Sequence, residues 1–230
     1  MCHYTTSGTR SRASMKADCT LVATVLALFA VATSGGSALA DPLVVLCAGD
    51  SITKQYAPVL QERRPDWTVV NAGVGGETSD SGARRLPGLL STYRPQVVVL
   101  AWGANDALQR VSNPRFTPRY TARQIRAMRS IVRSRGMRAI VALPVGTAPT
   151  DPSYGDVINA HLLQYGDALN DIRDAIGGKP PLVDFSLDQT LMFGVPQLGV
   201  GVHPDDAGVE IIVRRVEFAV ERALGLPRGP

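Results

Sequence analysis

The sequence predicts an α/β protein in which a doubly wound, five-stranded parallel sheet lies between two layers of helices. Short apolar runs rich in β-branched residues alternate with longer segments of helical period, and this alternation repeats five times. A chain of 230 residues, 45% hydrophobic and 19% charged, also has enough apolar surface for one sizeable core. Because crossovers between parallel strands are right-handed, the three-layer α/β/α sandwich is the most economical topology.

The expected strands are short apolar runs that suit a sheet buried on both faces. They cover residues 43–48, 68–72, 97–102, 139–144 and 182–185. Helical periodicity predicts helices over residues 51–64, 80–93, 117–135, 156–176 and 205–224. Gly136 and Gly177 follow two of these segments, as glycines often do where helices end. In such sheets ligands bind at the carboxyl ends of the strands, so we expect the functional residues there.

Residues 1–40 have the pattern of a secretory signal peptide. A basic stretch precedes an apolar run of thirteen residues, 21–33, and small residues follow it up to Ala40. An uncleaved membrane anchor is the weaker interpretation, because roughly 20 apolar residues are needed to cross a bilayer. We therefore expect cleavage after Ala40, a secreted or periplasmic protein without a stable membrane span, and a single domain over residues 41–230.

Composition excludes several classes of function. The chain has 24 Lys and Arg against 20 Asp and Glu, and no dense basic run interleaved with aromatic residues, so no nucleic-acid surface is expected. Three cysteines and three histidines cannot supply paired ligands at zinc spacing, so no metal site is expected. Cys47, the one cysteine left after cleavage, lies within an apolar strand and is interpreted as a small buried hydrophobic residue.

Four polar clusters fall at separate strand ends. Ser51 follows the first expected strand in the tripeptide GDS, Gly73 follows the second in a glycine-rich run, and Asn105 follows the third. His203 precedes the last expected helix. Each cluster alone is weak evidence, since Ser51 also suits a helix cap and Asn105 a turn. Together they supply a hydroxyl, a backbone N–H, an amide and an imidazole, which is the set that acyl transfer needs.

In their order and spacing these clusters resemble the GDSL/SGNH hydrolases, and the resemblance covers residues 43–224. The stretch NAGVGGETSDSGARRLPGLLSTYRPQVVVLAWGANDAL is most similar to secreted bacterial arylesterases and periplasmic acyl thioesterases with lysophospholipase activity. The resemblance implies the flavodoxin-like, five-stranded SGNH hydrolase fold. It also implies a serine esterase that hydrolyses carboxylic esters or acyl thioesters without a cofactor.

The same resemblance implies a role for each residue. Ser51 is the nucleophile and His203 the general base, while the backbone N–H groups of Ser51 and Gly73 and the amide of Asn105 form the oxyanion hole. In this mechanism the substrate is an ester carried on a small molecule or on a glycan.

One position departs from the family pattern. The family usually has an aspartate three residues before the histidine, and here that residue is Val200, which cannot accept the imidazole N–H. Three interpretations stay open. A backbone carbonyl accepts this N–H, or another acid does so, or catalysis is weakened or lost. The acids considered are Asp184, Asp188 and Asp205, although Asp205 also suits the cap of the last helix.

The sequence says least about the substrate. Met192, Phe193, Val195 and Leu198 precede His203 and are candidates for an acyl pocket, although apolar loop residues also simply pack on the body. A short-chain ester or acyl thioester is the first choice, and the O-acetyl group of a polysaccharide is its rival.

Two other classes of protein are alternatives. The loss of the aspartate at Val200 leaves a noncatalytic binding protein as an alternative. A flavodoxin-like nucleotide or flavin binder suits the topology but lacks a phosphate-binding loop after the first strand. Fold alone does not decide between such functions. The oligomeric state, the physiological substrate and the start codon, Met1 or Met15, are left open by the sequence.

Overall fold

The computed structural model of this protein describes residues 42–110, 113–145, 155–177, 182–183 and 203–226. Its centre is a parallel sheet of four strands of five to seven residues: β1 (Leu43–Gly49), β2 (Trp67–Gly73), β3 (Val97–Ala101) and β4 (Arg138–Ala142). A two-residue segment, β5 (Leu182–Val183), pairs with β4, and the order is β2-β1-β3-β4-β5. The doubly wound parallel sheet is therefore confirmed. The fifth strand, expected over residues 182–185, is described at its first two residues alone.

The five predicted helices all form, each beginning and ending within one residue of its expected bounds. They are α1 (Ser51–Arg63), α2 (Ser79–Tyr93), α4 (Pro118–Ser134), α5 (Gly155–Ile176) and α6 (Asp206–Leu224). A seven-residue helix, α3 (Ala104–Arg110), was not predicted, because it is too short to show a helical period. Among the described helices, none is long and apolar enough to cross a membrane.

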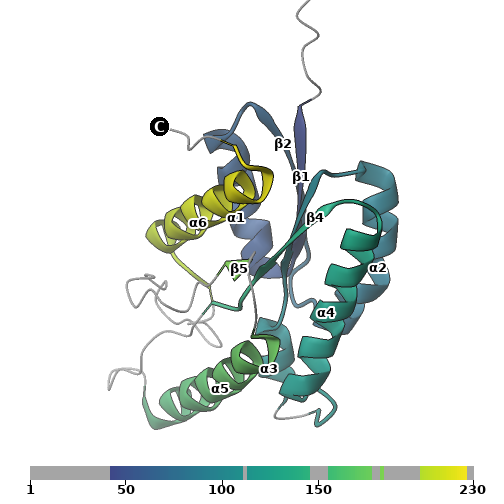
Figure 1. The fold of residues 1–230 in the computed structure, drawn as a ribbon. Helices are drawn as coiled ribbons and strands as arrows, with labels where there is room; N and C mark the ends of the chain where they lie inside the picture. Colours follow the sequence, from purple (N-terminus) through teal and green to yellow (C-terminus); the bar gives the residue numbers. More distant parts are fainter. Residues whose placement is uncertain (1–41, 111–112, 146–154, 178–181, 184–202, 227–230) are drawn as a thin grey trace, which may run out of the picture. The chain divides into compact units, whose positions relative to one another are not determined.

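The helices cover both faces of the sheet, and each face has its own apolar core. Figure 1 shows α1 and α6 on one side of the strands and α2 and α4 on the other. Alternate residues of β1 point to opposite faces: Val45 and Cys47 pack with α1 and α6, whereas Leu46 and Ala48 pack with α2, α4 and α5. Cys47 is fully buried, as predicted, and burial raises the pKa of its thiol to about 12.

Three strands of the sheet end at the same level, and this aligns the residues that follow them. Gly49, the last residue of β1, lies opposite Gly73 of β2 and Ala101 of β3. A Cβ on Gly49 would come 2.2 Å from Oγ1 of Thr53, and a Cβ on Gly73 would come 2.3 Å from the backbone N of Lys54. The first turn of α1 therefore lies directly against the ends of these strands, and it leaves no room for a side chain at either glycine.

A buried carboxylate joins the helices at the same end of the sheet. Asp106, in α3, accepts hydrogen bonds from the backbone N and the Oγ of Ser79, at 2.8 and 2.5 Å, and from Oγ1 of Thr121 at 2.9 Å. Ser79 begins α2 and Thr121 lies in α4, so one side chain links three helices. Burial raises the pKa of Asp106, although these hydrogen bonds act in the opposite direction.

Candidate active site

The structure brings together a serine and a histidine that lie 152 residues apart. Ser51 is the first residue of α1, and the carboxylate of Asp50 caps this helix by accepting the N–H of Ile52 at 3.0 Å. His203 lies just before α6, and its Nε2 is 2.7 Å from the Oγ of Ser51. The backbone N–H of Ser51 belongs to the first turn of α1, where N–H groups have no partner within the helix.

The protonation of His203 suits a proton acceptor. The side chain is half-buried, and burial lowers the pKa of the imidazole below its ordinary value. The ring is therefore mostly neutral at pH 7, and a neutral ring whose Nδ1 carries the hydrogen presents a lone pair on Nε2 to the Ser51 hydroxyl.

Of the three acids considered as the partner of the His203 imidazole, one lies within the described residues. Asp205 is the N-cap of α6 and accepts the N–H of Gly208 at 3.0 Å, which is the capping role also expected from the sequence. Asp184 and Asp188 lie outside the described residues, as does Val200. Within the described part of the chain, the imidazole of His203 makes its hydrogen bond with Ser51.

The two other expected donors each make one contact within the protein. Asn105 is the second residue of α3, and its Nδ2 donates to the backbone oxygen of Glu77 at 3.1 Å. An amide nitrogen carries two hydrogens, so one remains for a ligand. The N–H of Gly73 donates to Oδ1 of Asn71 at 3.1 Å, and Nδ2 of Asn71 donates to the backbone oxygen of Lys54 at 3.2 Å.

The carboxylate of Glu77 fixes the loop whose backbone oxygen accepts the hydrogen bond from Asn105. Its carboxylate accepts two hydrogen bonds from Arg85, at 2.9 and 2.5 Å, and one from Nε1 of the buried Trp102 at 3.0 Å. The loop between β2 and α2 is thereby tied to β3 and α2, so the carbonyl that binds Asn105 has a fixed position. Sequence reasoning missed Glu77. The signal was present, since a glutamate in a glycine-rich run precedes an arginine by eight residues.

Asp50, the residue before the nucleophile, is a buried acid. It is 3% exposed, and burial raises the pKa of its carboxyl to about 7, while the hydrogen bond from Ile52 acts to lower it. Its described contacts hold the start of α1 and not the imidazole. Asp50 therefore supports the position of Ser51 through the helix cap.

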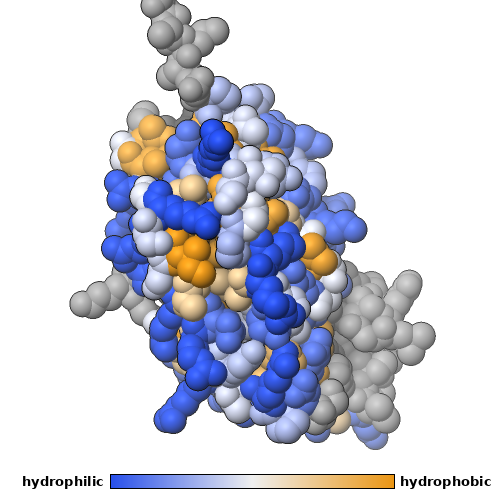
Figure 2. Space-filling model, turned by 90° about the vertical axis from the view of Figure 1, so that its right-hand side faces the viewer, coloured by the Kyte–Doolittle hydropathy of each residue, from blue (hydrophilic) through white to orange (hydrophobic). Residues whose placement is uncertain are grey.

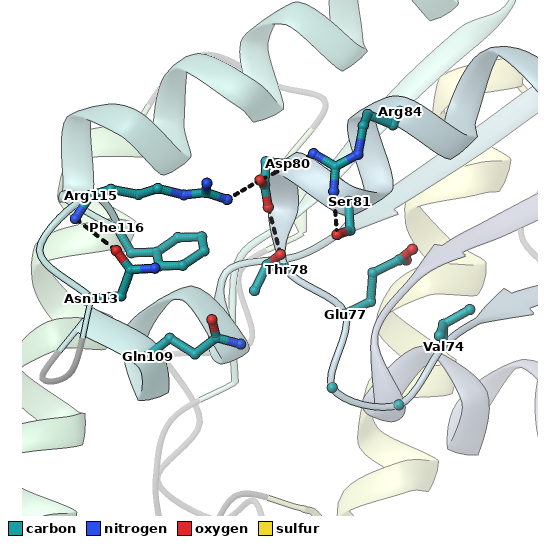
Figure 3. Close-up of a pocket in the computed structure, with 12 residues that line it drawn as sticks. Val74, Glu77, Thr78, Asp80, Ser81, Arg84, Gln109, Asn113, Arg115 and Phe116 are labelled. Carbon is teal, nitrogen blue, oxygen red and sulfur yellow. Dashed lines mark hydrogen bonds and ion pairs between the residues drawn. The ribbon is translucent and has the colours of Figure 1, made fainter.

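A cavity of about 550 Å³ lies along the loop that follows Gly73, and its lining does not include Ser51, Asn105 or His203. Its lining is mostly polar and comes from the β2–α2 loop, α2 and the segment after α3 (Figure 3). Asp80 stands in its wall, where it accepts hydrogen bonds from Thr78 at 2.6 Å and from Arg84 at 3.2 Å and pairs with Arg115. None of these lining side chains was singled out from the sequence, because residues from three segments meet there through the fold alone.

The expected acyl-pocket residues Met192, Phe193, Val195 and Leu198 lie outside the described residues. Over the part of the chain that is described, no group of three or more His, Cys, Asp and Glu side chains could hold a metal ion.

The family model named GDSL-like Lipase/Acylhydrolase matches residues 37–211, which include all four clusters. The chain belongs to the GDSL-like lipase/acylhydrolase family. This membership confirms the resemblance found in the sequence and makes the protein a GDSL-type hydrolase of ester bonds.

Two curated relatives of this GDSL-type hydrolase are named for such activities. An arylesterase from Vibrio mimicus is 25% identical over 185 residues, covering 74% of this chain and 84% of that protein. Thioesterase 1/protease 1/lysophospholipase L1 from Escherichia coli K12 is 27% identical over 192 residues, covering 77% and 82%. Among solved structures, a GDSL-like lipase from Bacteroides thetaiotaomicron superposes with a TM-score of 0.57 at 20% identity, over 78% of this chain and 88% of that one. The last similarity shows the shared fold.

Proposed function

We propose that this protein is a serine esterase that hydrolyses carboxylic esters or acyl thioesters through an acyl-enzyme on Ser51, with His203 as the general base. The observation that carries the proposal is the 2.7 Å separation between Nε2 of His203 and Oγ of Ser51. This is hydrogen-bonding distance, which a base needs to take the proton of a nucleophile. Family membership supports the reaction class.

The proton moves twice in each half of the reaction. Neutral His203 takes the hydroxyl proton as Oγ of Ser51 attacks the acyl carbon, and the tetrahedral adduct then collapses. His203 gives the proton to the departing alcohol or thiol, which leaves the acyl group on Ser51. A water molecule repeats the attack with His203 again as base, which releases the carboxylic acid and restores the serine.

Three donors are suited to the negative oxygen that forms in each adduct. The N–H of Ser51 lies at a helix N-terminus, where the helix dipole favours negative charge. The second hydrogen of the Asn105 amide is available, and the first fixes its direction. The N–H of Gly73 is bonded to Oδ1 of Asn71, so its use requires that an oxyanion displace this oxygen. An oxyanion is a stronger acceptor than an amide oxygen, which favours the exchange.

A serine–histidine pair needs an acceptor for the second imidazole N–H, and the proposal assigns it to a backbone carbonyl or to one of three acids. Asparagine variants separate these choices, because asparagine keeps the size of aspartate and removes its charge. We expect a loss approaching roughly 10⁴ in kcat for whichever of D184N, D188N and D205N removes the partner. If all three keep the wild-type kcat, a backbone carbonyl remains as the acceptor.

The cavity along the β2–α2 loop suits a polar part of a substrate. Its lining includes Arg84, Gln109, Asn113 and Arg115, which bind oxygen-rich groups better than a long alkyl chain. We therefore place short-chain esters and thioesters first. The same polar lining supports a second candidate, an O-acetylesterase that acts on a polysaccharide, because a sugar ring offers hydroxyls to these side chains.

Hydrolysis of p-nitrophenyl acetate, butyrate and octanoate by the wild type and by S51A tests the proposal. We expect activity that S51A abolishes and that declines from acetate to octanoate. The matched control is S81A, since Ser81 lies in the cavity wall and not beside His203. Serine-dependent activity that is highest on octanoate would contradict the preference for short chains. Activity unaffected by S51A would contradict the nucleophile.

A serine-directed phosphonate separates an enzyme from a binding protein. We expect one phosphonyl group on wild-type Ser51, detected as a mass increase, and none on S51A. If Ser51 is not labelled and no ester is cleaved, the protein binds an acylated ligand without cutting it.

We also propose that the protein is exported, because the pattern of residues 1–40 is that of a signal peptide. Expression of the whole chain with its own N-terminus, followed by mass measurement of the product in periplasm and medium, tests this. We expect a protein that begins at Asp41. Retention of the whole chain in the cytoplasm would contradict export.

A further inference from the structure

The charges of this protein are unevenly distributed along the chain. Residues 79–138 contain twelve arginines, no lysine and two acidic residues, whereas the rest of the chain contains twelve basic and eighteen acidic residues. The two acids of this segment, Asp80 and Asp106, are both buried. The segment runs from α2 to the start of β4, and nine of its twelve arginines are exposed. Arg110, one of the other three, pairs with the exposed Asp171 of α5.

Helix α4 carries the longest stripe of these arginines. Its exposed arginines are Arg119, Arg123, Arg126 and Arg133, at spacings that place them on one side of a helix. The opposite side is buried in the core. Arg126 donates to the backbone oxygen of Ala175 at 2.6 Å, while the ion pairs of the described residues include none for the other three.

Helix α4 contains no acidic residue, and this arrangement has a cost. Arginines four residues apart repel one another and destabilise a helix, whereas alternating charges would stabilise it. The stripe is therefore unfavourable for the isolated protein, and an external anion would relieve it.

The charged surface extends beyond α4. Figure 2 shows the side of the molecule that carries α2 and α4, where hydrophilic side chains are spread across the face with a few apolar residues between them. Helix α2 adds Arg84, and Arg94 follows its last residue. Arg84 and Arg115 also line the cavity described above, where both pair with Asp80, so one end of this arginine face borders that cavity. The arginine face is defined here by Arg84, Arg94, Arg115, Arg119, Arg123, Arg126 and Arg133.

We propose that the arginine face docks the protein on a membrane surface rich in anionic phospholipid. Guanidinium groups bind phosphate oxygens in pairs and are more weakly hydrated than ammonium groups, which suits the all-arginine composition. The arginines are spread over the outer surfaces of two packed helices, so they meet a plane better than a single thin chain. A lipid headgroup layer is such a plane, and each basic residue near it strengthens binding about fivefold.

Co-sedimentation of the full chain with vesicles tests the docking. Vesicles of phosphatidylcholine alone are compared with vesicles that also contain phosphatidylglycerol. We expect binding to the anionic vesicles, and we expect it to weaken between about 0.01 and 0.15 M salt, as the screening length falls from about 30 to about 8 Å. Residues 1–40 include a basic stretch that also favours anionic vesicles, and both variants described below retain it, so it does not account for a difference between them.

A matched pair of variants assigns the binding to this face. R119Q/R133Q removes two exposed arginines from α4, and R214Q/R222Q removes two exposed arginines from α6, on the opposite side of the sheet. In each pair one arginine lies in the last helical turn. We expect R119Q/R133Q to bind anionic vesicles about 25-fold more weakly, the product of two fivefold losses. R214Q/R222Q should bind within about twofold of the wild type, since its arginines face away from the membrane.

Several outcomes would overturn the proposal. These are equal binding to both kinds of vesicle, no binding to anionic vesicles at low salt, or equal losses in the two variants, which would indicate net charge alone. Binding of polygalacturonate in place of vesicles would indicate an acidic polysaccharide, and salt-sensitive dimers would indicate a second copy of the chain. Hydrolysis of p-nitrophenyl acetate should be the same in both variants. The docking and the esterase proposal therefore fail independently.

Discussion

Asn105 is positioned by a single contact to the backbone of Glu77, and this leaves one amide hydrogen for the reaction. Replacing it with alanine removes an oxyanion donor, which costs about 3 to 4 kcal/mol of transition-state stabilisation. We expect N105A to lower kcat on p-nitrophenyl acetate by roughly 10² to 10³ with a smaller change in KM. The control is N170A, which makes the same chemical change at an exposed position of α5. A wild-type rate in N105A would remove Asn105 from the oxyanion hole.

The environment of His203 makes a prediction about pH. Only the neutral imidazole can take the Ser51 proton, so activity falls as the pH drops through the pKa of His203. Burial lowers this pKa, and the enzyme should therefore stay active at lower pH than an ordinary histidine allows. We expect the acidic limb of the profile of kcat/KM against pH to have its midpoint below 6.5. A midpoint at or above that value would mean that a negative charge outweighs burial at the imidazole.

At the scale of the element, a substitution at Gly73 tests how tightly the end of β2 packs against α1. In G73A the new Cβ would come 2.3 Å from the backbone N of Lys54, which forces β2 away from α1. We expect a loss of about 1 to 3 kcal/mol in the free energy of unfolding, together with lower activity, because the start of α1 carries Ser51. Chemical denaturation and ester hydrolysis measure both.

The control is G88A, within α2. A Cβ at Gly88 meets nothing within 4 Å, and alanine is the better helix former there. We expect G88A to raise the free energy of unfolding by about 0.5 to 1 kcal/mol and to leave activity unchanged. If G73A behaves like G88A, the strand ends are looser than the structure describes.

The junction of three helices depends on Asp106. In D106A the Oγ and N–H of Ser79 and the hydroxyl of Thr121 lose their acceptor in a buried place. We expect the free energy of unfolding to fall by about 3 kcal/mol. The comparison is D171A, which removes an exposed ion pair with Arg110 and should cost less than about 1 kcal/mol. Similar losses in the two variants, measured by thermal unfolding, would show that the network adds little.

At the scale of the whole molecule, Cys47 reports on the integrity of the central sheet. It is fully buried on β1 between two helical layers, and its raised pKa keeps it in the unreactive thiol form. We expect a thiol reagent to label Cys47 only as fast as the domain unfolds, with denaturant accelerating labelling in step with the loss of circular dichroism. Peptide mapping locates the label. Rapid labelling of Cys47 in the native protein would show that the sheet opens locally.

The sequence determined the fold class and the bounds of most helices, because periodicity and capping are local properties. The apolar run at residues 97–102 predicts a strand, and the apolar stripe of α4 predicts a helix, without reference to the rest of the chain. Three of the four clusters were also visible because they stand at strand ends, and parallel strands bring their carboxyl ends to one edge. His203 was visible because it lies just before the last helix. Helix α3 was missed because seven residues give too short a pattern.

Only the tertiary structure decided how these groups meet. The 2.7 Å approach of His203 to Ser51, the loop fixed by Glu77 and the engagement of the Gly73 N–H by Asn71 depend on distances between remote segments. The cavity wall and the arginine face likewise combine residues from separate helices. A one-dimensional pattern specifies which side of an element is apolar. Packing of those sides against a shared core sets which polar groups come into contact, because each contact depends on the orientation of two elements at once.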